Sequence, residues 1–156
     1  MNKTNAMRLL DRAKLVYKTA EYPVDENDLS GTHIADEVGM PYEAVFKTLV
    51  ARGDKTGVIV LCIPVDRELD LKKAARISGN KKVEMVQMKE LLGLTGYIRG
   101  GCSPIGMKKK YPTFIDESCR TQAEIAVSAG IRGGQIIMDP AVLSAFVEAE
   151  MAELTV

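Results

Sequence analysis

The sequence contains no tryptophan, one histidine and three cysteines among its 156 residues. The cysteines, Cys62, Cys102 and Cys119, are widely separated and odd in number, and no Cys-x-x-Cys pair or Cys/His cluster occurs. Disulfide scaffolding and structural zinc are therefore not expected, and we expect a reducing, cytoplasmic location. Because His33 is the only histidine, little is left for a Ser-His or Cys-His catalytic pair. We expect neither a metal nor another cofactor.

Long apolar runs and a surplus of either charge are also missing. The longest apolar run has eight residues, 58–65, whereas a membrane-spanning helix needs about 20. The 21 Lys and Arg residues balance the 21 Asp and Glu residues. Non-specific nucleic-acid binders usually carry a basic surplus, because phosphate neutralisation supplies most of their affinity. A nucleic-acid partner would therefore have to contact a local patch or be held by another protein.

The order of the predicted elements favours one α+β domain over residues 1–156, since the length is near that of a typical single domain and no linker or repeat occurs. Periodicity and turn residues predict helices over 4–15, 32–39, 41–45, 70–79, 88–93 and 141–152. They predict strands over 17–24, 45–52, 57–65, 81–86, 113–118, 124–130 and 134–140. Strands and helices do not alternate strictly, which argues against a doubly wound fold.

Lys47 is the one misfit in the predicted strand Val45–Arg52, whose two faces are otherwise largely apolar. A lysine that points into an apolar surface is disfavoured as a cation unless an acceptor or an anion compensates its charge. The alternative is that the side chain reaches the rim and covers apolar surface with its stem. The pattern alone favours that alternative.

The segment RGGCSPIGMKKKYP, residues 99–112, combines glycines, a Cys-Ser-Pro turn and three lysines. It does not match the phosphate-binding pattern G-x-x-x-x-G-K-[ST], because Met107 precedes Lys108 and no Ser or Thr follows. Glycine amides here would suit an anion or an oxyanion, although a tight turn between core strands is favoured by the glycines alone. Cys102 is either a nucleophile or a small apolar filler, and the lysines are more typical of a solvated surface.

Four stretches together resemble the YbaK/EbsC family, free-standing relatives of the editing domain of bacterial prolyl-tRNA synthetases. They are VFKTLV (45–50), LDLKKAARISGNKKVEM (69–85), TGYIRGGCSPIGMKKKYPTFID (95–116) and AVSAGIRGGQIIMDP (126–140). The resemblance implies a mixed, partly barrel-like sheet edged by short helices. It also implies hydrolysis of misacylated tRNA, above all removal of cysteine from tRNA(Pro), with the tRNA 3′ end and prolyl-tRNA synthetase as partners.

The resemblance also implies roles for single residues. Lys47 would contact the terminal ribose or phosphate, and the amides of Gly100 and Gly101 would face the ester carbonyl. Gln135 lies where some cysteine-removing relatives carry an acidic residue, which leaves the amino-acid selectivity open. The residues expected to bind substrate are Tyr22, Thr48, Ser103, Pro104, Ser128, Gly130, Arg132 and Gln135.

Two chemical routes and several functions remain open from the sequence. In one route the thiol of the substrate cysteine attacks its own carbonyl and leaves as a cyclic thioester. In the other, bound water attacks, which would suit alanine. The alternatives to cysteine removal are a deacylase for alanine or another amino acid, a module that binds aminoacyl-tRNA or nucleotides without hydrolysis, and a structural partner of a synthetase.

Overall fold

The computed structural model describes residues 1–156. Its helices are α1 (Asn5–Arg12), α2 (Gly31–Val38), α3 (Leu71–Ser78), α4 (Met88–Thr95) and α5 (Pro140–Phe146), with short 3₁₀ turns η1 (Tyr42–Ala44) and η2 (Glu117–Thr121). Its strands are β1 (Lys18–Glu21), β2 (Phe46–Gly53), β3 (Gly57–Pro64), β4 (Val83–Met85), β5 (Thr113–Asp116), β6 (Ile125–Ser128), β7 (Gly134–Met138) and β8 (Glu150–Ala152). No helix has the length and apolar character needed to cross a membrane.

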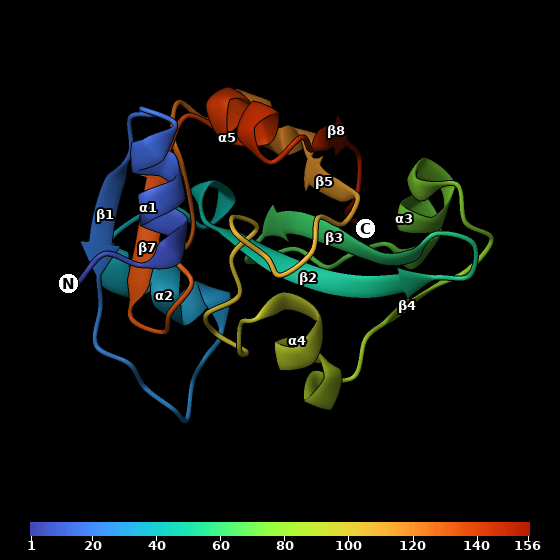
Figure 1. Ribbon diagram of the computed structural model, residues 1–156, viewed down its shortest axis with the longest axis horizontal. Helices are drawn as coiled ribbons and strands as arrows, with labels where there is room; N and C mark the ends of the chain where they lie inside the picture. The colour runs from blue at the N-terminus through green and yellow to red at the C-terminus, as the bar shows by residue number, and fades with distance from the viewer.

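The strands form two sheets, and the expected mixed α+β fold is confirmed. A five-stranded sheet has the order β4-β2-β3-β5-β8, and a three-stranded sheet has the order β1-β7-β6 (Figure 1). The five-stranded sheet is mixed, because β3 pairs with β5 in parallel and with β2 in antiparallel orientation. A single parallel bridge between Val45 and Ala126 joins the start of β2 to β6, so the two sheets meet there.

The β2–β3 hairpin is closed by a buried asparagine. The side-chain oxygen of Asn80 accepts hydrogen bonds from the backbone N–H groups of Lys55 and Thr56, at 2.8 and 3.0 Å. A Cβ atom on Gly53 would lie only 2.1 Å from the Asn80 side chain, so the last residue of β2 has to be glycine. The hairpin that the sequence predicted is therefore fixed by a contact from the end of α3.

Helix ends follow the signals in the sequence. The side-chain oxygens of Ser30 and Asp70 accept hydrogen bonds from the first turns of α2 and α3, as N-cap residues do. Gly39 and Gly79 end the same helices with φ angles of 71° and 78°, in the left-handed region where glycine has no steric cost. The predicted positions of both helices are confirmed.

The end of the chain differs from the prediction of one helix over residues 141–152. Helix α5 ends at Phe146, and Glu148 adopts a φ of 55°, which reverses the chain. Residues Glu150–Ala152 then form β8, which pairs in parallel with β5. The helical spacing of the apolar residues was misleading because the edge of β5 offers these three residues a strand partner.

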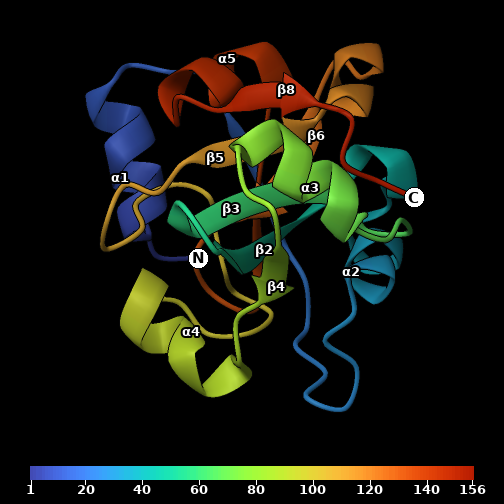
Figure 2. The same ribbon diagram turned by 90° about the vertical axis from the view of Figure 1, so that its right-hand side faces the viewer.

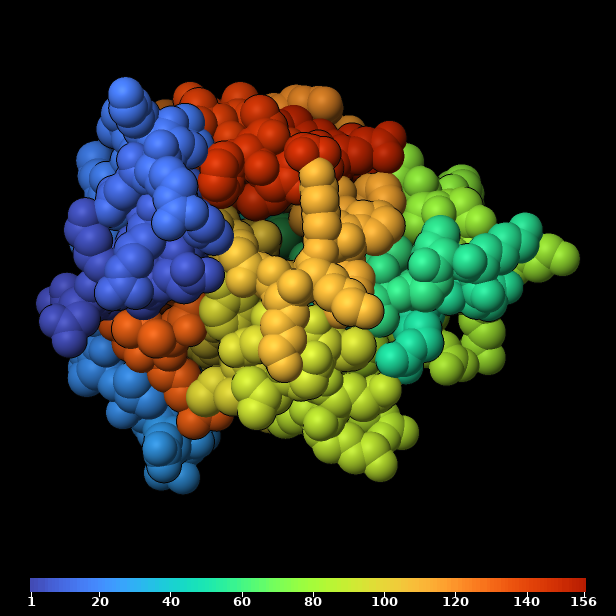
Figure 3. Space-filling view, viewed as in Figure 1, coloured from blue at the N-terminus to red at the C-terminus, as the bar shows by residue number.

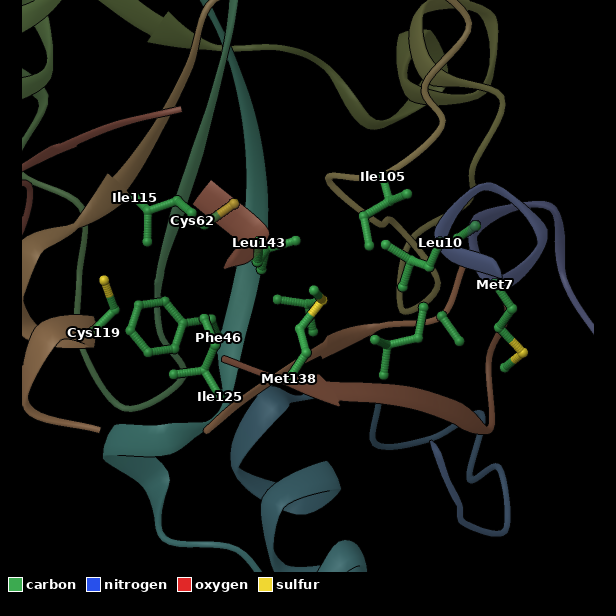
Figure 4. Packing of buried hydrophobic residues seen from close by; sticks show 14 of the residues in the cluster. Met7, Leu10, Phe46, Cys62, Ile105, Ile115, Cys119, Ile125, Met138 and Leu143 are labelled. Atoms are coloured by element: carbon green, nitrogen blue, oxygen red, sulfur yellow. The ribbon is translucent and has the colours of Figure 1, made fainter. Parts of the chain in front are cut away.

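The core is divided by the five-stranded sheet. Phe46 and Cys62 belong to the larger cluster, which α1 and α5 also contact, whereas Ala51 and Leu61 belong to the cluster beneath α3. This is the alternation of side chains expected for β2 and β3. The larger cluster includes Ile105 from the glycine-rich segment, whose side chain is fully buried near that of Leu10 (Figure 4).

Candidate functional site

A cavity of about 410 Å³ lies where the two sheets separate. Its walls come from β2, the start of α2, the β4–α4 segment, the glycine-rich segment and the facing strands β6 and β7. Small-molecule sites usually fall between about 300 and 1,000 Å³, so the volume suits a small ligand or the end of a larger one. The lining residues are Leu29, Ser30, Gly31, Ile34, Val45, Phe46, Lys47, Thr48, Leu49, Val50, Val65, Met85, Val86, Gln87, Met88, Leu91, Arg99, Gly100, Cys102, Ser128 and Gln135.

The cavity follows an open edge of β2. The N–H of Val65 donates to the carbonyl of Val45 at 2.9 Å, which sets the alternation of the ladder with β3. The backbone groups of Thr48 therefore point away from β3. On that side β4 pairs with β2 from Ala51 onward, the N–H of Val86 donates to the carbonyl of Val50, and the bridge to β6 lies at Val45, just before β2. Between these points no strand pairs with this edge of β2, and the cavity lies against the unpaired stretch.

Lys47 and Arg99 are the only charged residues that line the cavity, and both are cations. Lys47 is half-buried, and its Nζ atom lies 3.5 Å from the carbonyl oxygen of Val65, with no ion-pair partner. A buried or half-buried cation that lacks a carboxylate partner favours an anion or oxygen-rich ligand in the space beside it. The lysine that appeared as a misfit in the sequence thus faces the cavity.

The glycine-rich segment brings two unengaged amides to the cavity. Gly100 and Cys102 line it, and neither of their N–H groups donates a hydrogen bond within the protein. Gly101 lies between them, but its N–H donates to the carbonyl of Ile98 at 2.9 Å and the residue does not line the cavity. Instead, Gly101 packs against the next turn, where a Cβ atom would lie 3.0 Å from the backbone of Ile131.

Ser103 and Pro104 lie behind this segment rather than in the cavity wall. Both are buried, and Ser103 Oγ accepts a hydrogen bond from the N–H of Ile105 at 3.2 Å. The hydroxyl of Tyr97 donates to the carbonyl of Ile105, and the Ile105 side chain fills the core. The Ser-Pro turn therefore anchors the amides that precede it.

Ser128 and Gln135 lie at the floor of the cavity on neighbouring strands. They are register partners in the β6–β7 ladder. Gln135 is only 3% exposed, and its side-chain oxygen Oε1 is buried without a hydrogen-bond partner. Ser128 Oγ accepts a hydrogen bond from the N–H of Gly130 at 3.1 Å. A buried amide oxygen without a partner costs stability, which makes it a candidate contact for a ligand donor.

Gly130, Arg132 and Tyr22 do not line the cavity. The Nε of Arg132 donates to the carbonyl of Arg99 at 2.9 Å, which ties the β6–β7 turn to the glycine-rich segment. Gly130 adopts a φ of 97° and packs against Tyr97. The N–H of Tyr22 donates to the carbonyl of Gly133 at 3.0 Å, at the end of the same turn. These residues hold the two loops together.

Comparison with known proteins identifies the family. The family model for the aminoacyl-tRNA editing domain matches residues 30–146. The chain belongs to this family. It is 49% identical to EbsC of Enterococcus faecalis, a proposed Cys-tRNA(Pro)/Cys-tRNA(Cys) deacylase, over 98% of this chain and 93% of that protein. The resemblance found in the motifs is confirmed.

Two further relatives match this editing domain, one over its whole chain and one over a small part of a larger enzyme. The crystal structure of a proposed trans-editing enzyme for prolyl-tRNA synthetase superposes with a TM-score of 0.85 at 26% identity, covering 100% of this chain and 99% of that one. A proline–tRNA ligase of Thermosipho africanus is 28% identical over 59% of this chain and 16% of the ligase. The editing domain thus corresponds to a small part of that synthetase.

The editing domain offers no ordinary general base in its cavity. Neither a histidine nor a carboxylate lines it. Burial raises the pKa of the Cys102 thiol to about 11, so the thiol stays protonated at neutral pH. Burial likewise raises the pKa of Cys62, the cross-strand neighbour of Thr48, to about 12. Cys102 therefore lacks the thiolate character of a nucleophile.

Much of the apolar lining of the editing domain was not anticipated from the sequence. Leu29 comes from the segment before α2, Ile34 comes from α2 itself, and Met85, Met88 and Leu91 come from the β4–α4 segment. Met85 and Met88 are 45% and 60% exposed in the structure, and the sequence around them gave no signal that they line a cavity. Their position on the cavity depends on how α4 folds back against β2, which local periodicity does not determine.

Proposed function

We propose that this editing domain removes cysteine from tRNA(Pro) that carries it in place of proline, by cleaving the aminoacyl ester. The relative EbsC, whose name gives this activity, aligns with almost the whole chain. The observation that carries the proposal is the meeting of Lys47 with two unengaged backbone amides, those of Gly100 and Cys102, in one cavity. A cation and paired amides are what an ester and its oxyanion require.

The amides of Gly100 and Cys102 hold the ester carbonyl in this proposal. A well-placed donor to an oxyanion contributes about 3–4 kcal/mol to the transition state. We assign Cys102 rather than Gly101 as the second donor because the Gly101 N–H already donates to Ile98. Gly101 keeps the two amides in place by its close packing against Ile131. Lys47 contacts the oxygens of the terminal ribose or phosphate.

The α-ammonium group of the aminoacyl ester binds the Oε1 atom of Gln135. An ammonium needs an acceptor, and no carboxylate lines the cavity. Gln135 Oε1 is buried and unpartnered, and a hydrogen bond to a charged donor contributes about 1.5–3 kcal/mol. The hydroxyls of Thr48 and Ser128, which also line the cavity, complete the polar contacts to the substrate.

Positioning roles fall to the site residues outside the cavity wall. Ser103 and Pro104 anchor the amide-bearing segment to the core through the Ile105 turn. Arg132 bonds that segment to the β6–β7 turn, which Gly130 shapes with its positive φ. Tyr22 fixes the other end of this turn through its backbone. Each would alter catalysis by displacing the amides of Gly100 and Cys102.

The thiol of the substrate itself is the nucleophile in this proposal. Its sulfur attacks the carbonyl carbon, a C–S bond forms, and the C–O bond to the ribose breaks. The thiol proton ends on the ribose oxygen, which leaves tRNA with a free hydroxyl and a four-membered cyclic thioester that water later opens. The absence of a histidine or carboxylate base in the cavity supports this route. Water attack is the route for an alanyl ester.

We also propose that prolyl-tRNA synthetase acts alongside this domain. The part of the Thermosipho synthetase that the chain resembles covers 16% of that enzyme, and the structural relative is named for trans-editing with such a synthetase. A domain of zero net charge would gain from a partner that holds the tRNA body. Co-elution of the two proteins in the presence of tRNA(Pro) tests this, and separate elution contradicts it.

The deciding experiment compares deacylation of Cys-tRNA(Pro) and Ala-tRNA(Pro) by the wild type, Lys47→Ala and the control Lys55→Ala. Lys55 is an exposed lysine in the β2–β3 turn, outside the cavity. We expect the wild type and Lys55→Ala to release cysteine, with Lys47→Ala slower by at least about 10²-fold. An added external thiol separates the two routes, because it converts the cyclic thioester into a new thioester but does not react with the free cysteine that water attack releases.

Hydrolysis of the alanyl ester alone would keep the reaction class and move the chemistry to bound water. No hydrolysis of either ester, with or without the synthetase, would favour a binding module. Near-normal activity of Lys47→Ala would contradict the assignment of this cavity.

A further inference from the structure

The surroundings of the cavity carry charge of opposite sign on two sides. The segment after β1, residues 22–30, reaches the cavity through Leu29 and Ser30, and α4 reaches it through Met88 and Leu91. Figure 2 shows α4 and this segment on opposite sides of the lower part of the molecule. These two sides flank the cavity, so the charge on each bears on the path of a tRNA whose 3′ end occupies it.

The first side is acidic. Asp25, Glu26 and Asp28 are all exposed, and none of them pairs with a lysine or arginine. Hydrogen bonds from Ser30 lower the pKa of Asp28, so its carboxylate stays charged. His33 is its nearest cationic candidate, at 3.7 Å. These three carboxylates, the acidic edge, repel a phosphate backbone.

The second side is basic. Lys89, Arg99, Lys108 and Lys109, here called the basic edge, are exposed, and none of them takes part in an ion pair. The next lysine, Lys110, differs because it pairs with Glu148. Four cations without counter-ions on one side of the cavity form a local patch that the zero net charge of the chain conceals.

The basic edge is held in place by α4. The N–H of Lys108 donates to the carbonyl of Thr95 at 3.1 Å, and the hydroxyl of Tyr111 donates to the carbonyl of Leu94 at 2.7 Å. The lysine segment is thereby tied to the last turn of α4, whose first residue, Met88, lines the cavity. The helix rise between these ends is about 10 Å. Figure 3 shows this part of the chain exposed on the face that also carries α1 and α4.

We propose that the basic edge binds the phosphate backbone of the tRNA acceptor stem, so that the tRNA body lies over α4 and away from the acidic edge. This inference rests on the proposed function, because it takes the cavity as the site of the aminoacylated 3′ end. Lys and Arg side chains bind phosphates by releasing condensed counter-ions, and unpaired cations on an anchored segment lose little freedom in doing so. The acidic edge supplies the direction by repulsion.

The test measures binding of fluorescently labelled, uncharged tRNA(Pro) and its acceptor-stem hairpin across a series of salt concentrations. The variant is Lys108→Glu with Lys109→Glu. The control, Lys55→Glu with Lys81→Glu, changes the net charge equally in the turns at the far end of the β2–β3 hairpin. All of these lysines are exposed, and thermal melting verifies that each variant is folded.

We expect the variant at Lys108 and Lys109 to bind at least tenfold more weakly and to show a flatter salt dependence. The loss of two phosphate contacts reduces the slope of log K against log salt by about 1.4 to 1.8. The control should match the wild type. An unchanged slope, an equal loss in the control, or no RNA binding by the wild type even at low salt overturns the proposal.

A parallel measurement keeps this proposal separate from the proposed function. Cysteinyl-adenosine carries the ester but no acceptor stem, so the variant at Lys108 and Lys109 should cleave it at the wild-type rate. If the wild type binds RNA through the basic edge but cleaves neither substrate, the function fails and the docking surface stands. If it cleaves both and the variant binds tRNA normally, only the docking surface fails. Binding that appears only with the synthetase present assigns the RNA contact to the synthetase and also overturns it.

Discussion

Ser128 and Gln135 lie directly opposite each other in the β6–β7 ladder, and both reach the cavity that β2 leaves open. Their side chains differ in one respect. Ser128 Oγ accepts a hydrogen bond from the N–H of Gly130, whereas Gln135 Oε1 has no partner. The protein therefore retains at this point a buried acceptor that no protein group satisfies and that is free to bind a ligand donor.

Gln135→Met should raise the stability of the protein and impair its activity. The substitution removes a buried unsatisfied oxygen, whose cost is about 1–3 kcal/mol, while it nearly preserves side-chain length. The KM for Cys-tRNA(Pro) should rise by about 10-fold or more, because the α-ammonium loses its acceptor. A substrate acylated with 3-mercaptopropionate, which lacks the amine, should show no difference between the two proteins. A similar loss with that substrate would assign Gln135 a structural role.

The dependence of the rate on pH should come from the substrate. No histidine or carboxylate lines the cavity, and burial raises the pKa of Cys102 to about 11. With Cys-tRNA(Pro), the single-turnover rate, after subtraction of the spontaneous hydrolysis of the ester, should rise with pH. It should level off near the ordinary thiol pKa of about 8.5. Cys102→Ala should keep this profile and at least about half of the rate. An inflection between pH 5 and 7, shared by cysteinyl and alanyl substrates, would reveal a base that the protein supplies.

Gly101→Ala should slow deacylation, whereas Gly93→Ala should stabilise the protein. A Cβ atom on Gly101 would lie 3.0 and 3.1 Å from backbone atoms of Ile131 and Arg132, so the amide-bearing segment has to shift. A displacement of about 1 Å at such a site can reduce the rate by about 10². Gly93 lies within α4 with open space around it, so alanine there should add about 0.5–1 kcal/mol to the free energy of unfolding. Deacylation rates and urea unfolding of both variants check this prediction.

Stability should fall in alkaline solution because the buried thiol of Cys62 keeps its proton. Its pKa is raised from 9.0 to about 12 by burial. Above about pH 9 the unfolded chain releases this proton while the folded chain retains it, so the free energy of unfolding decreases as pH rises. For Cys62 the loss between pH 8 and 10.5 is about 2 kcal/mol. Cys62→Ala should lower stability at pH 8 through its lost packing but reduce the fall by that amount. An unchanged pH dependence would contradict the assignment.

Local signals in the sequence were sufficient for the parts of the fold that local interactions determine. Ser30 and Asp70 cap their helices, and Gly39 and Gly79 end them, so both helices were predicted correctly. Strand β8 was missed because its three residues form a strand only through pairing with β5. Spacing along the chain carries no information about a pairing partner more than thirty residues away.

The candidate site was predictable to the extent that its residues broke a local pattern. Lys47 interrupts an apolar strand, and it does line the cavity. The engagement of the Gly101 amide by Ile98 was not predictable, because it depends on the exact path of the loop. Nor was the apolar wall from Met85 and Met88, which depends on how α4 packs near β2. Whether each proposed residue acts on substrate stays a prediction.

Ile105 inserts into the core beside Leu10, so the same residues support the folding of the domain and the position of the loop that the proposed function requires. A catalytic loop at the surface of an enzyme usually tolerates substitutions without a loss of stability in the domain beneath it. Here the segment that presents Gly100 and Cys102 ends three residues before Ile105, whose side chain is fully buried. A substitution that shortens the Leu10 side chain would leave a cavity beside Ile105. The loop would then become more mobile, and the discrimination between amino acids would decrease before the protein unfolds. Under the proposed function, cells carrying such a variant would first insert cysteine at proline codons, and would lose the protein only at higher temperature.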